Sequence, residues 1–198
     1  MEIKKATFLT SVTDPRKLPD THLPEIVIAG KSNVGKSSFI NTLANQNKLA
    51  KVGQTPGKTR MVNYFIVNDG FCVVDLPGYG FAKVSAEERM RWGRLVEGYL
   101  QASKNIKHIF LMVDIRHAPN ENDIQLLQWM EYFGYPYTIV ASKADKIAKS
   151  KWKAHIDVIM NTFEIETVAI PFSTVKKIGR TEILSIIENI LAGSEKVG

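Results

Sequence analysis

The chain has 198 residues, of which 44% are hydrophobic and 23% charged, so bulk disorder is excluded and one α/β domain fits the length. No run approaches the roughly 20 apolar residues of a membrane span, and the first residues lack an apolar signal core, so we expect a cytoplasmic protein that binds no membrane. The net charge of +6 favours an acidic partner such as nucleic acid, and the single cysteine, Cys72, fits a reducing compartment.

Residues 1–24 are expected to form an N-terminal extension, with a strand near 3–9 and a proline-rich connection. A compact domain follows over 25–192, and residues 193–198 form a tail.

In the domain, apolar runs alternate with helical patterns. Strands are expected near 25–30, 61–67, 71–75, 107–113, 137–142 and 167–172, and helices near 36–45, 86–102, 120–132, 150–162 and 181–191. This alternation predicts an α/β fold with a mainly parallel six-stranded sheet and helices on both faces. The run 68–70, Asn-Asp-Gly, predicts a hairpin and hence one antiparallel edge strand.

Residues 30–37 read Gly-Lys-Ser-Asn-Val-Gly-Lys-Ser and follow an apolar strand directly. This is the arrangement of a phosphate-binding loop, in which backbone N–H groups and the N-terminus of the next helix face the phosphates. Lys36 would reach the β- and γ-phosphates, and the hydroxyl of Ser37 would bind Mg²⁺. The alternative is a flexible turn between a strand and a helix. The context favours a P-loop NTPase fold.

A second motif, Asp-Leu-Pro-Gly at 75–78, ends the strand near 71–75. Carboxyl ends of parallel strands form the ligand crevice of such sheets, so Asp75 can hold Mg²⁺ through water. The backbone N–H of Gly78 would meet the γ-phosphate. A threonine from the long loop 46–60 should complete the metal shell, where Thr55 and Thr59 compete and Thr59 lies nearer the next strand.

A third motif selects the base. The strand near 137–142 ends in Ser142, Lys143, Ala144 and Asp145. The carboxylate of Asp145 can accept hydrogen bonds from N1–H and the exocyclic amine of guanine, which adenine cannot supply. Lys143 would lie along the base and hold the phosphate loop. Backbone N–H groups of residues 172–176 could meet the guanine O6.

Taken together, the segments 30–37, 56–60, 75–80, 113–117, 142–145 and 173–174 resemble the EngB family of bacterial GTPases, also called YsxC or YihA. The resemblance covers nearly all of 25–192. It implies a TrmE-Era-type G domain, Mg²⁺-dependent hydrolysis of GTP to GDP, and a role in maturing the large ribosomal subunit. Members are also described as needed for normal cell division and septation. Ser142 departs from the usual Asn or Thr, although its hydroxyl should preserve guanine recognition.

The resemblance and the motifs together define the expected site. The residues expected to contact the nucleotide are Gly30, Lys31, Ser32, Asn33, Val34, Gly35, Lys36, Ser37, Ser38, Gly57, Lys58, Thr59, Arg60, Met61, Asp75, Leu76, Pro77, Gly78, Ser142, Lys143, Ala144, Asp145, Phe172, Ser173 and Thr174. Those expected to act in catalysis are Asn33, Lys36, Thr59 and Gly78. The expected metal ligands are Ser37 and Thr59, with Asp75 through water.

Several roles stay open. Tyr79 stands where many GTPases have a glutamine that orients the attacking water, so slow intrinsic hydrolysis is the hypothesis. Asn33 either helps to bind K⁺ beside the phosphates or only shapes the loop. Arg116 and His117 either touch the segment after Gly78 or cap the next helix. The three tryptophans are expected to serve packing rather than base stacking.

Three functions are compatible with these motifs. The first is a GTP-gated monomer that binds the large ribosomal subunit through rRNA and ribosomal proteins. The second is a septal or cell-cycle switch that recognises protein alone. The third, a P-loop phosphotransferase, is disfavoured by the guanine-type motif and by the lack of an obvious lid domain.

Overall fold

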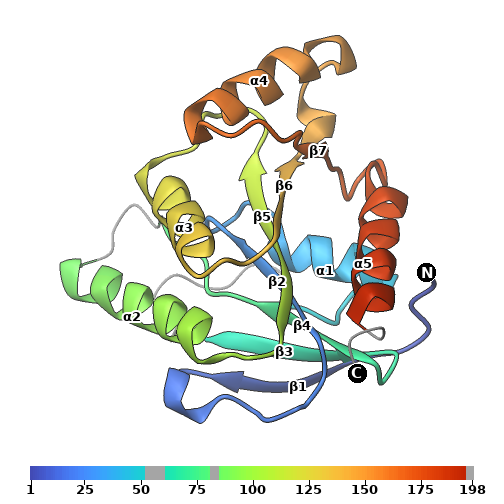
Figure 1. Cartoon of the computed structure of the whole chain (residues 1–198). Coiled ribbons are helices and arrows are strands. Elements are labelled where there is room, and N and C mark those ends of the chain that lie inside the picture. The colour runs from blue at the N-terminus through green and yellow to red at the C-terminus, as the bar shows by residue number, and fades with distance from the viewer. Residues whose placement is uncertain (52–60, 81–84, 195–198) are drawn as a thin grey trace.

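The computed structural model describes residues 1–51, 61–80 and 85–194 (Figure 1). The strands in these residues are β1 (Ala6–Val12), β2 (Glu25–Gly30), β3 (Val62–Val67), β4 (Phe71–Asp75), β5 (Ile106–Asp114), β6 (Tyr137–Ser142) and β7 (Ile170–Pro171). The α-helices are α1 (Lys36–Ala44), α2 (Ala86–Ala102), α3 (Glu121–Tyr132), α4 (Trp152–Phe163) and α5 (Arg180–Ser194). No helix in these ranges is both long and apolar enough to cross a membrane.

Within the described residues the strands form one seven-stranded sheet with the order β1-β3-β4-β2-β5-β6-β7. Strands β4, β2, β5, β6 and β7 run parallel, whereas β3 is antiparallel to both β4 and β1. The predicted α/β fold class is confirmed. The sheet has seven strands rather than six because β1 pairs along β3. Strand β1 therefore forms the edge of the sheet. Strand β3, the antiparallel strand that was predicted at the edge, lies second. Pairing with β1 satisfies backbone groups that β3 would otherwise leave open.

The sheet separates two apolar cores. Along β2 the side chains alternate, so that Val27 and Ala29 pack with α2, α3 and α4. Ile26 and Ile28 pack on the other face with α1 and α5. Figure 1 shows α2 and α3 on one side of the sheet and α1 and α5 on the other. A strand buried on both faces is typical of the centre of a parallel sheet, and it fixes the loop that follows β2 against the core.

The turn between β3 and β4 has the predicted hairpin geometry. Asn68 and Asp69 both have positive φ angles, of 49° and 52°. The N–H of Gly70 donates to the carbonyl of Val67 at 3.0 Å. Two consecutive left-handed residues define the turn type that matches the twist of paired strands.

At the opposite end of β2 from the phosphate loop, Glu25 is buried with 2% of its surface exposed. Its Oε2 accepts hydrogen bonds from the hydroxyls of Tyr99 at 2.6 Å and Ser103 at 2.8 Å. Burial raises the pKa of Glu25, and the two hydrogen bonds only partly oppose this shift. The carboxyl group fastens β2 to the C-terminal end of α2, because both donors belong to that end of the helix.

This raised pKa makes the stability of the protein depend on pH. The folded state holds the Glu25 proton more tightly than the unfolded chain, so stability falls as pH rises from the unfolded pKa of about 4.5 through the folded pKa. In the variant Glu25→Gln this loss is absent. We expect the unfolding free energy of the variant, minus that of the original protein, to be larger at pH 8 than at pH 5. At a pH well above both pKa values, each unit of pKa rise contributes about 1.4 kcal/mol to the difference between the two proteins.

Urea unfolding of both proteins at several pH values measures this difference. A difference that stays constant from pH 5 to pH 8 would contradict the assignment of a buried, charge-sensitive Glu25. The variant Glu25→Ala should be less stable at every pH, because it leaves the hydroxyls of Tyr99 and Ser103 without their acceptor.

Candidate nucleotide-binding site

The motifs predicted to form the site meet at one edge of the sheet. The phosphate loop (30–37) follows β2, the 77–80 segment follows β4, the guanine loop (142–146) follows β6, and the 172–176 loop follows β7. All four strands are parallel, so their carboxyl ends open on the same edge. Predicted contact residues 57–60 lie outside the described residues, as does Thr55, and their roles stay predictions.

The phosphate loop is tightly folded. Gly30, Asn33 and Gly35 all have positive φ angles, of 143°, 63° and 111°. A Cβ atom on Gly30 would lie 2.4 Å from the carbonyl oxygen of Met112, so only glycine allows the loop to lie this close to β5. Gly35 caps the start of α1 without a side-chain hydrogen bond, which leaves the positive end of the helix dipole for a ligand.

A buried lysine and a buried aspartate lie beneath the phosphate loop. Lys36 is 9% exposed and Asp75 is 6% exposed, and Nζ of Lys36 donates to the carbonyl of Gly30 at 3.1 Å. Burial lowers the pKa of Lys36 and raises that of Asp75, and the attraction between the two charges opposes both shifts. Burying two charged groups costs desolvation free energy. Buried charges with shifted pKa values are typical of sites that bind charged ligands.

Two buried oxygens at this place have no hydrogen-bond partner among the described residues: Oδ1 of Asp75 and Oγ of Ser32. Such atoms are rare in folded proteins and point to a missing ion, water or ligand. Ser37 lies in the first turn of α1, where its hydroxyl can join a metal shell. In the described part of the chain, no group of three or more His, Cys, Asp or Glu side chains forms a metal site. The carboxylate of Asp75 and the hydroxyl of Ser37 are oxygen donors, which suit a cation such as Mg²⁺ that also keeps water and phosphate ligands.

The 77–80 segment lies directly against the phosphate loop. A Cβ atom on Gly78 would lie 2.8 Å from Oγ of Ser32 and 2.9 Å from Nζ of Lys36. The N–H of Ser32 donates to the carbonyl of Tyr79 at 2.8 Å. On the other side of the segment, the indole N–H of Trp92 donates to the carbonyl of Pro77 at 2.7 Å. The segment thus links the phosphate loop to α2.

Tyr79 faces the core rather than the site. Its side chain is 2% exposed, its hydroxyl donates to Oδ1 of Asp123 on α3, and its ring packs edge-on against Trp92 with centroids 5.1 Å apart. Trp92 in turn stacks on Trp129 at 5.9 Å. The packing role predicted for these two tryptophans is confirmed. The sequence position alone did not indicate Asp123 as the partner of Tyr79.

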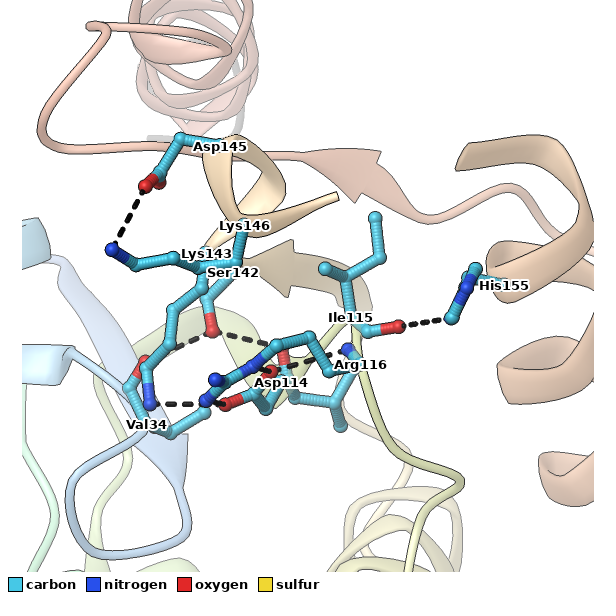
Figure 2. A network of polar contacts seen from close by, with 10 residues as sticks. Val34, Asp114, Ile115, Arg116, Ser142, Lys143, Asp145, Lys146 and His155 are labelled. Carbon is cyan, nitrogen blue, oxygen red and sulfur yellow. Dashed lines mark hydrogen bonds and ion pairs between the residues drawn. The ribbon is translucent and has the colours of Figure 1, made fainter. Parts of the chain in front are cut away.

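Ser142 joins the guanine loop to the phosphate loop (Figure 2). Its hydroxyl lies 2.9 Å from the carbonyl of Val34 and 2.9 Å from that of Val113, and the residue is 2% exposed. The sequence predicts that Lys143 holds the phosphate loop. In the structure Ser142 makes this contact, whereas Nζ of Lys143 lies 2.9 Å from Oδ2 of Asp114. Serine has one hydroxyl hydrogen, so it can donate fully to only one of these two carbonyls at a time.

Asp145 is held ready to accept hydrogen bonds. The hydroxyl of Ser173 donates to its Oδ1 at 2.6 Å, and this hydrogen bond lowers the pKa of Asp145. The N–H of Ala144 donates to the carbonyl of Phe172 at 3.0 Å, which joins the guanine loop to the 172–176 loop. The indole of Trp152 supports the guanine loop from α4 by donating to the carbonyl of Ala144 at 3.0 Å.

The 172–176 loop offers fewer backbone donors than predicted. The N–H groups of Phe172 and Ser173 donate to the carbonyls of Ala141 and Ile178, and the N–H of Lys176 donates to Oγ of Ser173. Of the five predicted donors, those of Thr174 and Val175 are therefore left to meet a base.

Among the described residues, Arg116 and His117 neither cap α3 nor contact the segment after Gly78, and residues 81–84 of that segment lie outside the described ranges. The guanidinium of Arg116 donates to both oxygens of Asp114, at 2.9 and 2.7 Å, and α3 is capped by Asn120. The backbone N–H of His117 donates to the carbonyl of Asp114 at 3.0 Å. Burial raises the pKa of Asp114, but hydrogen bonds from Arg116 and Lys143 outweigh burial and hold that pKa below its usual range. The run 113–117 is characteristic in sequence, yet it does not indicate that Asp114 also pairs with Lys143.

The chain was compared with known proteins. A family model described as "50S ribosome-binding GTPase" matches residues 25–143. A probable GTP-binding protein EngB from Alkaliphilus metalliredigens is 44% identical over 197 residues, which cover 98% of this chain and 95% of the relative. The protein of the same name from Bacillus subtilis is 44% identical over 193 residues, which cover 96% of this chain and 99% of the relative.

Solved structures agree on the fold. A crystal structure of a probable GTP-binding protein engB has a TM-score of 0.71 at 24% identity and covers 85% of this chain and 99% of its own. A variant of Era from Aquifex aeolicus, bound to GDP and aluminium fluoride, has a TM-score of 0.64 at 26% identity and covers 83% of this chain and 56% of its own. On the extent and level of these matches, the chain belongs to the EngB family of GTP-binding proteins, among the ribosome-binding GTPases.

Proposed function

We propose that the protein is a GTP-hydrolysing molecular switch that acts in the cytoplasm during assembly of the large ribosomal subunit. The observation that carries this proposal is the packing of Gly78 against Ser32 and Lys36. A γ-phosphate in the phosphate loop would lie beside the backbone of Gly78, so the presence of that phosphate would decide where the 77–80 segment rests. The nucleotides are GTP and GDP, and the partners are rRNA and ribosomal proteins.

The described residues divide the work of binding. Asp145 would accept the N1–H and amine hydrogens of guanine while Ser173 holds the carboxylate in place. Lys36 and the N-terminus of α1 would face the β- and γ-phosphates. Mg²⁺ fits the same place, with Ser37 as a direct ligand, Asp75 acting through water, and Thr59, outside the described residues, completing the shell. When bound, Mg²⁺ neutralises charge on the phosphates.

The change of state would pass to α2. Loss of the γ-phosphate would remove the partner of the Gly78 N–H and so one of the contacts that hold the 77–80 segment. The carbonyl of Pro77 is bonded to Trp92, and Trp92 stacks on Trp129 of α3. A shift of the segment would therefore move the surface of α2 and α3, where a partner can sense it.

Hydrolysis by the protein alone should be slow. Tyr79 is buried and bonded to Asp123, so it cannot orient a water at the γ-phosphate as a glutamine does. Asn33 lies exposed in the phosphate loop with a positive φ angle, where its side chain can help to bind K⁺ beside the phosphates. A monovalent cation there would stabilise charge that develops during hydrolysis.

The ribosomal assignment rests on the family and on charge. The family model is that of 50S ribosome-binding GTPases, and the net charge of +6 favours RNA. A requirement in cell division and septation would then follow indirectly from failed ribosome assembly. A septal switch that recognises protein alone would use the same nucleotide site and is the alternative. A phosphotransferase is less well supported, because the Asp145–Ser173 pair serves guanine selection.

The base assignment is tested by Asp145→Asn. Asparagine replaces one acceptor oxygen with an N–H₂ donor, which suits xanthine, whose C2 carries an oxygen in place of the amine. We expect GTP binding to weaken by at least about 100-fold and xanthosine triphosphate to bind the variant better than it binds the original protein. Titration calorimetry with both nucleotides measures this. The same exchange at Asp69 in the β3–β4 hairpin is the matched control and should change neither affinity.

The role of Asn33 is tested by comparing GTP hydrolysis in potassium and sodium buffers of equal ionic strength. We expect faster phosphate release in K⁺, and we expect Asn33→Ala to remove that difference while GDP binding persists. Equal rates in the two salts would leave Asn33 with the shaping of the loop alone.

The switch and its partner are tested by co-sedimentation with purified large ribosomal subunits. The protein is loaded with GDP or with a non-hydrolysable GTP analogue, and binding is followed across a salt series. We expect preferential binding in the GTP state and a steady weakening as salt rises, because contacts to rRNA release counterions. Absence of binding in both states would overturn the ribosomal assignment and favour a protein-only partner.

A further inference from the structure

The carboxylate of Asp114 lies at the edge of the site between the charged side chains of Arg116 and Lys143 (Figure 2). The expected contacts with guanine do not explain this arrangement. Nε and Nη2 of Arg116 donate to its two oxygens at 2.9 and 2.7 Å, and the backbone N–H of Arg116 donates to Oδ1 at 3.1 Å. Nζ of Lys143 lies 2.9 Å from Oδ2. The side chain of Asp114 is 16% exposed, compared with 31% for Lys143 and 39% for Arg116. The acid is thus the most enclosed member of the group.

Asp114 is fixed by its backbone before its side chain is considered. It is the last residue of β5 and pairs in register with Ser142 on β6. The N–H of Ile115 donates to the carbonyl of Ser142 at 3.0 Å, and the carbonyl of Ile115 lies 3.0 Å from Nδ1 of His155 on α4. The fork of Arg116 then sets the direction of the carboxylate, since two parallel hydrogen bonds permit one orientation.

Lys143 has a fixed backbone and a flexible side chain. Its φ angle is 59°, and its neighbours Ser142 and Asp145 are both held by hydrogen bonds. Only the four-carbon side chain is left to choose a position. A free lysine would lose this freedom whenever a nucleotide lay against it, which weakens binding. The pairing with Asp114 removes part of that freedom beforehand.

We propose that Asp114, oriented by Arg116, is a positioning residue that holds Lys143 across the guanine site and so strengthens nucleotide binding. This inference rests on the proposed guanine nucleotide site. The effect concerns the base and not the phosphates, because Lys143 belongs to the guanine loop. It therefore applies equally to GTP and GDP, and the choice between guanine and adenine stays with Asp145.

The test is a double-mutant cycle with Asp114→Asn and Lys143→Met, read out by fluorescent GDP titration and by the rate of GDP release. Asparagine keeps the shape of Asp114 but removes the charge that attracts Lys143. We expect Asp114→Asn to weaken GDP and GTP binding about three- to tenfold and to speed GDP release to a similar extent. In a Lys143→Met background the same exchange should change affinity by less than about twofold.

Asp157→Asn is the matched control, because Asp157 pairs with Lys153 at 2.7 Å on the exposed side of α4. This variant should bind both nucleotides as the original protein does. Unchanged affinity of Asp114→Asn would overturn the inference. So would an equal loss in the presence and absence of Lys143, since Asp114 would then act through another group.

A second variant protects the test against failure to fold. Arg116→Met leaves the contact between Asp114 and Lys143 but removes the fork that orients the carboxylate, so a smaller loss of about twofold is expected, again only when Lys143 is present. If the original protein bound no guanine nucleotide at all, the proposed function would fail. Normal binding that does not respond to these variants would instead reject the positioning role alone.

Discussion

The buried hydroxyl of Ser142 lies 2.9 Å from each of two carbonyls, those of Val34 and Val113, and so joins the phosphate loop, β5 and the guanine loop. These segments come from three different strands, and only the parallel order of the sheet brings their ends together. The hydroxyl has one hydrogen for two acceptors, where an asparagine would offer two. At the base end of the site, a small side chain therefore makes the contact that joins these segments. Contacts of the neighbouring residues, namely Asp114 with Lys143 and Ser173 with Asp145, supply further support.

The phosphate end differs from the base end in how its polar groups are satisfied. There the structure keeps charges and polar atoms incompletely satisfied: Lys36 and Asp75 are buried, and oxygens of Asp75 and Ser32 have no partner among the described residues. A nucleotide with its metal would supply the missing partners. In the proposed function, the base end would thus be built in advance, whereas the phosphate end would be completed by the ligand. This division suits a protein whose shape must depend on one phosphate.

The sequence predicted what short motifs determine. The phosphate loop, Asp75, Gly78 and Asp145 were assigned from residue types at fixed spacing, and each lies at the expected edge of the sheet. Contacts between distant segments could not be assigned in this way. Asp114 meets Lys143 only because β5 and β6 are neighbours, and Tyr79 meets Asp123 only because the segment after β4 and α3 pack into the same core on one face of the sheet. The edge position of β1 was missed for a related reason, since an amphipathic strand does not specify its partner.

Tryptophans lie at both ends of the site, so the intrinsic fluorescence of the protein can be used to follow each end. Trp92 is buried and bonded to the carbonyl of Pro77, and Trp152 is bonded to the carbonyl of Ala144 in the guanine loop. Indole emission responds to hydrogen bonding and to the polarity around the ring. The intrinsic fluorescence of Trp92 and of Trp129 stacked on it should therefore respond to changes at the phosphate end, and that of Trp152 to changes at the base end. Removing one indole at a time would separate arrival of the base from arrival of the γ-phosphate without any added label.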